Sequence, residues 1–402
     1  MKRTDGLKTR QVHLDFHTSP RIKGVAVDFS PAEYAMTLKR ARVNSVTTFA
    51  KCHHGMSYYD TKVGVKHPHL KRDLMGEMIM ACHDNGINAP VYISVCWDEN
   101  IAEKHPEWRH VDAEGNAIAH GMMKPHWRNV CLNTPYADYV AAQAVEIMKN
   151  YDVDGFFFDI VTHPGNGCYC RWCAGDRKAL KLDVSEAGLR KHKEIVLERF
   201  MSRMTALVKE RAPDATIFYN GCVKIGMRQS LRHFTHLEIE SLPSGQWGYD
   251  HFPFYVRHCG TLGKDLLGMT ACFHKSWADF GSVKNLAALE YECFSMIAHG
   301  CACSVGDQMH PRGALNKATY DRLGEVYSQV EKKEKWCLGA KPVSQIGLLS
   351  VAATKPVAGF MHPSDVGAMR MLLETHHQFD VLDAGADFSK YKLLLLPDEA
   401  LV

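Results

Sequence analysis

Eight short apolar runs alternate with longer amphipathic stretches over the first 336 residues, and this alternation constrains the fold more than any other feature. The short runs are typical of buried parallel strands, and the amphipathic stretches are typical of helices. Several helical stretches begin at a proline after a capping residue, as at Ser30-Pro31 and Thr134-Pro135. Eight β/α units in this length predict a (β/α)8 TIM barrel with long loops. The strands are expected at residues 12–16, 45–49, 91–95, 155–159, 216–219, 237–240, 267–273 and 301–305.

The pattern changes after Trp336. Residues 341–402 indicate a strand at 345–350, a helix at about 365–376, and strands at 379–382 and 391–396. This order is typical of the start of an open, flavodoxin-like α/β sheet whose remaining strands are missing. We therefore expect a catalytic barrel over residues 1–340 and an incomplete second domain over 341–402, within a longer parent protein.

Charge and hydropathy disfavour two classes of partner. The net charge is +3 with neutral histidines, and no Lys/Arg block exceeds two residues, which argues against a nucleic-acid surface or a polybasic membrane patch. No stretch approaches 18 apolar residues and the amino terminus is polar, so neither a membrane span nor an export signal is expected. The fourteen cysteines are then expected to be reduced thiols of a cytoplasmic protein.

A carboxylate ends the fourth apolar run. Asp159 follows Phe156–Phe158 and precedes a loop rich in Gly, Pro, His and Cys. A charge beside a buried strand costs free energy unless it is paired, and in a TIM barrel catalytic groups gather at the carboxyl ends of the strands. The pattern predicts a catalytic Asp159. The alternative is a structural acid that accepts hydrogen bonds from loop amides.

The sixth strand supplies a second acid. Glu238 and Glu240 lie two residues apart and so share one face, with Glu240 nearer the carboxyl end. We predict that Glu240 is the partner of Asp159, with its pKa raised by a wall such as Trp247 or Trp277. Glu238 is expected to be a buried polar partner or a substitute. In the alternative, both glutamates line the core and bind Lys or Arg.

Polar and aromatic residues follow the other strand ends, where a polyhydroxylated ligand would need them. His53 and His54 are the most distinctive, and their alternative role is a helix-cap cluster. The predicted substrate-binding residues are His13, His17, Lys51, His53, His54, Tyr59, Trp97, Asn220, Glu238, Trp247, His274, Trp277, Asp307 and Arg312.

Four cysteines have the spacing of a metal site. Cys168, Cys170 and Cys173 form a CxCxxC motif, and Cys131 precedes an Asn/Pro helix start. Four thiolates can close a tetrahedral zinc site that would pin two loops together. Free thiols in a reduced loop are the alternative.

The segment Lys51-Cys52-His53-His54-Gly55 resembles the Lys-His-His-Asp-Gly segment that ends the second barrel strand of the α-L-fucosidases. Their nucleophile is an aspartate at the end of the fourth strand, matching Asp159. The likeness is greatest to the group often classed as glycoside hydrolase family 151, in which such a barrel precedes a β-galactosidase-type trimerisation domain. The cysteine set resembles the structural zinc site of those β-galactosidases. Two departures are Cys52 in place of a histidine and the lack of an aspartate before Gly55.

The resemblance implies a retaining α-L-fucosidase that acts on a fucosylated or galactosylated glycan, without a catalytic cofactor and as a homotrimer. Asp159 would be the nucleophile and Glu240 the acid/base. A β-galactosidase or another retaining glycosidase is the first alternative, and a non-catalytic carbohydrate-binding scaffold is the second. A metal-dependent hydrolase is disfavoured, since His13 and His17 would lie about 13 Å apart along a strand.

Overall fold

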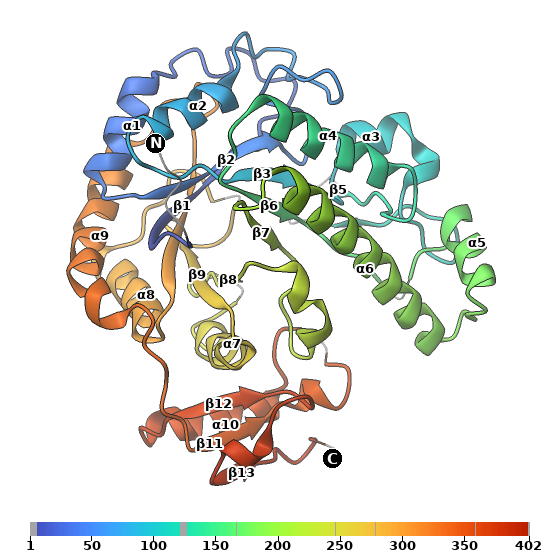
Figure 1. The fold of residues 1–402 in the computed structure, drawn as a ribbon, viewed down its shortest axis with the longest axis vertical. Coiled ribbons are helices and arrows are strands. Elements are labelled where there is room, and N and C mark those ends of the chain that lie inside the picture. The colour runs from blue at the N-terminus through green and yellow to red at the C-terminus, as the bar shows by residue number, and fades with distance from the viewer. Residues whose placement is uncertain are drawn as a thin grey trace.

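The computed structural model describes residues 6–120, 127–165, 167–245, 247–277, 279–357 and 359–400. Eight parallel strands form the barrel in the order β7-β6-β3-β2-β1-β10-β9-β8, which confirms the predicted fold class (Figure 1). Thr235, just before β8, closes the ring between β7 and β8. Its backbone N–H donates to the carbonyl of Ile217, and its hydroxyl accepts from the backbone N–H of Ile217. The barrel strands are β1 (Arg10–Asp15), β2 (Ser45–Lys51), β3 (Val91–Ser94), β6 (Gly155–Asp159), β7 (Thr216–Tyr219), β8 (His236–Glu240), β9 (Asp265–Ala271) and β10 (Ala302–Gln308).

Helices surround the barrel, as Figure 1 shows. Side-chain caps start several of them; the Ser30 side chain, for example, accepts from the Glu33 N–H, and Pro31 follows at the first helical position. The helices are α1 (Pro31–Arg40), α2 (Leu74–His83), α3 (Glu99–Lys104), α4 (Tyr136–Asn150), α5 (Arg171–Ala179), α6 (Glu186–Arg211), α7 (His251–Cys259), α8 (Leu286–Ala298) and α9 (Lys317–Cys337). Short 3-10 turns lie at Pro106–Trp108, Met227–His233, Gly260–Leu262, Val351–Ala353 and Phe388–Lys390, and a small antiparallel pair, β4 (Ala119–His120) and β5 (Trp127–Arg128), lies in the loop after β3.

An aromatic layer fills the barrel beneath its carboxyl-terminal mouth. The rings of Phe49 and Tyr92 are stacked with centroids 3.8 Å apart, and His13 meets Phe157 at 4.7 Å. These residues point inward because each lies two positions from another inward residue along its strand. This layer, called the aromatic floor below, lies directly beneath the polar residues of the mouth.

The last residues form a second, smaller α/β unit. Its three parallel strands have the order β12-β11-β13. Helix α7 of the barrel packs beside this sheet, where the backbone carbonyl of Val381 lies 3.2 Å from Nδ1 of His258, and Arg228 forms an ion pair with Asp383 at 2.7 Å. The elements are β11 (Ile346–Leu349), α10 (Pro363–Glu374), β12 (Phe379–Leu382) and β13 (Leu393–Leu395). In the described part of the chain, no helix has the length and apolar character needed to cross a bilayer.

Candidate active site

Two carboxyl groups share one amide donor at the mouth of the barrel. Asp159 ends β6, Glu240 ends β8, and Asn220 follows β7 between them. The Asn220 Nδ2 group donates to Asp159 Oδ1 at 2.7 Å and to Glu240 Oε2 at 3.1 Å. The two bonds meet at one nitrogen, so the acceptor oxygens lie at most about 5.8 Å apart, below the roughly 6.5–9.5 Å of inverting glycosidases and near the about 5–5.5 Å of retaining ones.

Each carboxyl group also has a donor of its own. The Tyr92 hydroxyl donates to Asp159 Oδ2, and the Trp277 indole donates to Glu240 Oε1 at 2.8 Å. Tyr92 points into the barrel from β3, and Trp277 comes from the loop after β9. Trp277 reaches Glu240 because Gly306 leaves space for its ring: a Cβ on Gly306 would lie 2.4 Å from the indole Cη2 atom.

Burial is the main cause of the electrostatic properties of this pair. It raises the pKa of Asp159, and the bonds from Tyr92 and Asn220 oppose that rise. Burial also raises the pKa of Glu240; the bonds from Trp277 and Asn220 lower it, while the negative charge of Asp159 raises it further. The Asp159 charge thus favours a protonated Glu240. An ionised Asp159 beside a protonated Glu240 is the charge state that a nucleophile and a general acid require.

The chain leaves Asp159 through a strained but well-anchored turn. Ile160 has a φ of 56°, which is unusual for a β-branched residue. Its carbonyl accepts from the Cys96 N–H at 3.1 Å, and the Val161 N–H donates to the Asn220 carbonyl at 2.9 Å. These bonds fix the direction in which the carboxyl group of Asp159 points.

His53 presents a hydrogen-bond acceptor to the site. The Ser94 hydroxyl donates its one hydrogen to the Trp97 carbonyl at 2.6 Å, so the 2.7 Å contact with His53 must run from Nδ1–H to the serine oxygen. Burial is the main cause that holds the pKa of His53 well below its usual value, and the neighbouring His17, His54 and Lys51 lower it further. The ring is therefore neutral, with the lone pair of Nε2 located 3.8 Å from Asp159 Oδ2.

His17 supports His53 from below. The two rings are stacked with centroids 3.8 Å apart, and the His53 backbone N–H donates to His17 Nδ1 at 3.1 Å. Because that nitrogen accepts, the His17 proton lies on Nε2, which donates to Asp15 at 2.9 Å. His17 thus positions His53 from the β1 side.

Aromatic rings form one wall of the mouth. Trp97 meets His53 edge to face at 4.7 Å, and Trp127 meets His54 at 4.6 Å. Burial lowers the pKa of His54 to about 4, so this ring is neutral as well. Sequence reasoning identified neither Trp127 nor Tyr92 as a site residue. Tyr92 could have been found from its position two residues before Ser94 on one strand face, whereas Trp127 lies in a long loop without such a signal.

Two predicted substrate-binding residues point away from the mouth, and both predictions are wrong. A β-bulge between Phe49 and Lys51 turns Lys51 outward, where its ammonium binds Asp98 at 2.8 Å and the Tyr136 hydroxyl at 2.9 Å. Tyr59 is fully buried beside α4 and donates to Glu146 at 3.0 Å. Both side chains hold loops against the outer helices.

Asp307 and Arg312 are likewise engaged elsewhere, which corrects their prediction as binding residues. Asp307 is next to the inward-facing Gly306 and therefore faces outward, where it accepts from the Cys272 thiol at 3.2 Å. Arg312 forms an exposed bidentate ion pair with Asp28. Neither residue contacts the carboxyl pair.

The remaining predicted residues lie around or below the site. Glu238 lines a cavity at the amino-terminal end of the barrel together with Gln11, Thr47 and His236, and burial raises its pKa well above the usual value. His13 belongs to the aromatic floor, and its pKa is lowered to about 4 by burial. Trp247 stacks on Phe360 of the second domain at 5.6 Å, and His274 is exposed.

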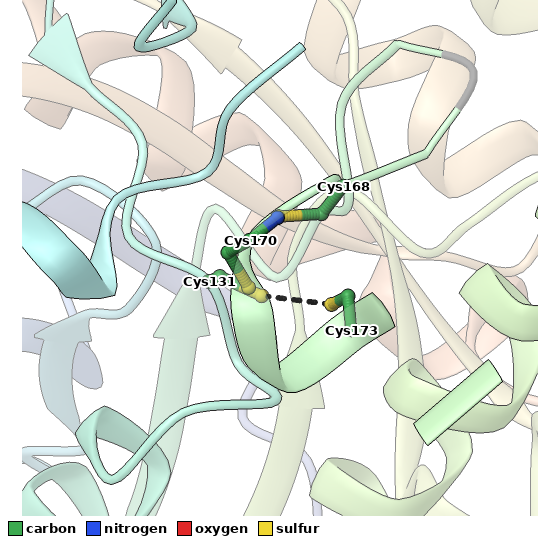
Figure 2. A group of neighbouring side chains, drawn as sticks. All are labelled: Cys131, Cys168, Cys170 and Cys173. Atoms are coloured by element: carbon green, nitrogen blue, oxygen red, sulfur yellow. Dashed lines mark hydrogen bonds between the residues drawn. The ribbon is translucent and has the colours of Figure 1, made fainter. Parts of the chain in front are cut away.

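The four predicted metal-ligating cysteines gather at one point. Cys131 follows β5, Cys168 and Cys170 lie on the loop leading into α5, and Cys173 lies in the first turn of α5 (Figure 2). All four are buried, and their sulfur atoms lie within 4.8 Å of one another, with 3.4 Å between Cys131 and Cys173. A tetrahedral Zn–S distance of about 2.3 Å requires sulfur separations of about 3.8 Å, so this donor set fits zinc.

Comparison with known proteins finds glycoside hydrolases that share this fold. Residues 30–160 match a family described as Hypothetical glycosyl hydrolase 6. The chain is similar to the solved α-L-fucosidase isoenzyme 2 from Paenibacillus thiaminolyticus, with 39% identity, 98% of this chain and 60% of that chain covered, and a TM-score of 0.93. The resemblance to α-L-fucosidase barrels that the sequence indicated is confirmed. The chain spans 60% of the length of that fucosidase.

More distant structures share the fold alone. The β-galactosidase from Rahnella sp. R3 is 15% identical, with 98% of this chain and 67% of that chain covered and a TM-score of 0.71. A GH29 α-L-fucosidase from Bacteroides thetaiotaomicron is 16% identical, with 80% and 65% covered and a TM-score of 0.52. No curated protein matches the sequence.

Proposed function

We propose that this chain is a retaining exo-glycosidase, an α-L-fucosidase that removes terminal sugar residues through a covalent glycosyl-enzyme intermediate. The observation that carries the proposal is the pair Asp159 and Glu240, because one shared amide holds Asp159 Oδ1 and Glu240 Oε2 at most about 5.8 Å apart. The 39% identity to a fucosidase supports fucose as the sugar.

The first step would form a bond between Asp159 and the sugar. The Asp159 carboxylate attacks the anomeric carbon while the glycosidic C–O bond breaks, and Glu240 gives its proton to the leaving oxygen. In the second step the Glu240 carboxylate takes a proton from water, and the resulting hydroxide displaces Asp159 from the anomeric carbon. Two inversions at this carbon give overall retention of configuration.

The surrounding residues would bind the sugar. The lone pair of His53 Nε2 accepts a hydrogen bond from one sugar hydroxyl, since the ring is neutral and its other nitrogen is occupied by Ser94. Trp97 and Trp127 offer apolar faces to the ring carbons. Holding the sugar against Asp159 in this way lowers the entropic part of the barrier.

The test is hydrolysis of aryl glycosides by the chain and by Asp159→Asn. We expect turnover of an aryl α-L-fucoside, little turnover of an aryl β-D-galactoside, and a loss of at least about 1000-fold in kcat/KM in the variant. Asp307→Asn is the matched control, because this buried strand-end acid faces away from the mouth and its loss should leave the rate unchanged.

Product stereochemistry separates the remaining candidates. Proton NMR of the first-formed sugar should show retained configuration, and azide added to Asp159→Gly should give a glycosyl azide of inverted configuration. Preference for the galactoside would favour a β-galactosidase on the same barrel. No turnover of any aryl glycoside, with sugar binding intact, would favour a carbohydrate-binding scaffold. An inverted product from the unmodified chain would rule out the covalent mechanism.

We also propose a structural zinc ion on Cys131, Cys168, Cys170 and Cys173, supported by the separation of their sulfur atoms. The ion would join the segment after β5 to the start of α5. Bound zinc should be found by elemental analysis of the purified protein, and the ion held by the four cysteines should be lost in Cys168→Ser, together with several degrees of thermal stability. Absence of zinc from protein purified without chelators would contradict this site.

A homotrimer built through the second domain is a further proposal. The edge strand β13 exposes Leu393 and Leu394, and Met371 of α10 is 66% exposed. Exposed apolar side chains on an edge strand are typical of surfaces that another element or subunit covers. Light scattering should give three times the mass of the chain, and Leu394→Glu should yield monomers.

A further inference from the structure

A second group of metal ligands lies beside the four cysteines. His163 from the loop after β6, His192 from α6 and Cys173 from α5 place one ligand atom each within 4.8 Å of one another. All three side chains are at least 99% buried. This group is separate from the carboxyl pair and shares only Cys173 with the tetrathiolate set.

Both histidines have a buried ring nitrogen without a hydrogen-bond partner. These are Nε2 of His163 and Nδ1 of His192. An unpaired buried polar atom costs about 1–3 kcal/mol, so one such nitrogen on each of two neighbouring rings, whose centroids are 6.3 Å apart, indicates a shared ligand.

The opposite nitrogen of each ring is already held. His192 Nε2 contacts Asp176 Oδ2 at 2.9 Å, and Asp176 in turn accepts from Arg199 at 2.7 Å. His163 Nδ1 lies 3.3 Å from His110 Nε2. A carboxylate behind an imidazole whose other nitrogen is free is the usual arrangement of histidines that bind metal, because it fixes the ring and increases its basicity.

We propose that His163 Nε2, His192 Nδ1 and Cys173 Sγ bind a second zinc ion, with the Cys173 thiolate bridging it to the tetrathiolate zinc. Three protein ligands leave one tetrahedral position for water. One Zn²⁺ with four thiolates leaves a buried charge of −2, and the second ion neutralises it, which reduces the desolvation cost. The inference does not depend on the glycosidase proposal.

The second ion would also tie down the loop after β6, which follows the proposed nucleophile Asp159. The tetrathiolate connects the segment after β5 to α5, whereas the ion on His163 also reaches α6 through His192. His163 is four residues after Asp159. Its ligation would therefore fix the far end of the strained turn at Ile160.

Zinc stoichiometry of the folded chain tests the proposal. Elemental analysis after dialysis against metal-free buffer should give two zinc ions per chain, and one in His163→Gln and one in His192→Gln, with glutamine filling most of the lost volume. Cys168→Ser removes a ligand of the tetrathiolate site alone and should leave one ion. The matched control is His258→Gln, because His258 also has an unpartnered buried nitrogen but belongs to no such ligand group among the described residues, and it should keep two ions.

The outcomes distinguish the two sites. One zinc per chain that is lost in Cys168→Ser and kept in both glutamine variants would overturn the second site and leave the tetrathiolate site standing, with a water bridging the two imidazoles. One zinc per chain that is kept in Cys168→Ser and lost in both glutamine variants would support the histidine site alone. Titration with Co²⁺ is an independent measurement in folded protein: a second equivalent should add visible d–d absorption that His163→Gln lacks. No metal in any sample would overturn both sites without bearing on glycoside hydrolysis.

Discussion

Substituting Asn220 by alanine should move both limbs of the pH–rate profile. The side chain donates to Asp159 at 2.7 Å and to Glu240 at 3.1 Å, and each bond stabilises the ionised carboxylate. A hydrogen bond to a charged group contributes about 1.5–3 kcal/mol, and one pKa unit corresponds to about 1.4 kcal/mol. Loss of the amide should therefore raise the pKa of Asp159 and of Glu240 by about one to two units each.

The direction of the change follows from the two roles. Asp159 must be ionised to attack, so a higher pKa moves the acidic limb of kcat/KM to higher pH. Glu240 must be protonated to act as the acid, so a higher pKa moves the basic limb the same way. The whole bell-shaped pH profile of kcat/KM in Asn220→Ala should thus shift to higher pH by about one to two units. The assay is kcat/KM for an aryl α-L-fucoside from pH 3 to 10 at constant ionic strength.

Two single-donor variants make the test specific. Tyr92→Phe removes a donor from Asp159 alone and should move only the acidic limb, whereas Trp277→Phe removes a donor from Glu240 alone and should move only the basic limb. If Asn220→Ala lowers the rate while neither limb moves, the shared amide does not tune the two carboxyl groups and the assignment of roles is refuted.

Three further substitutions test how other residues are used. Lys51→Met should destabilise the fold by about 3–5 kcal/mol in urea unfolding, because it breaks a buried ion pair. The control Lys66→Met breaks a more exposed pair and should cost about 1 kcal/mol or less. A raised KM in Lys51→Met without loss of stability would instead support Lys51 as a substrate-binding residue. Glu238→Gln should stabilise the chain increasingly as pH rises above about 4.5, because a raised native pKa means that the folded state holds a proton that the unfolded state releases; an equal effect at pH 4 and pH 7.5 would contradict this. Gly306→Ala should displace the Trp277 ring and move the basic limb as Trp277→Phe does, with at least about a 10-fold loss in kcat/KM, and an unchanged rate would show that the ring is not held by this contact.

The fold and the positions of the two acids at the mouth were predictable because they follow from the residue period and the direction of the strands. A continuous apolar run that ends in Asp159 indicates a strand buried on both faces and a charge at its mouth. The two-residue period links Glu240 to the same face as Glu238 and decides which is nearer the mouth. Both inferences need only the local sequence and the direction of the strand.

The predictions for Lys51 and Asp307 were wrong because alternation along the strand did not give the direction of the side chain. Lys51 lies two residues after the inward-facing Phe49, so a regular strand would point it into the barrel, but the bulge between them reverses its face. Asp307 lies in a strand buried on both faces, where composition does not reveal which parity is inward. In both cases backbone geometry that the residue types do not encode determined the outcome.

Asn220 shows what barrel topology adds once the strand order is known. Around a (β/α)8 barrel consecutive parallel strands are neighbours, so β7 must lie between β6 and β8. A residue that follows β7 at the same height as Asp159 and Glu240 is then forced between the two acids, and an amide is the one neutral side chain that can donate to both at once. An aspartate here would repel both carboxylates, and an aliphatic residue would remove the donor that they share. The shared donor therefore follows from the strand order, and the closeness of the carboxyl groups follows from the shared donor.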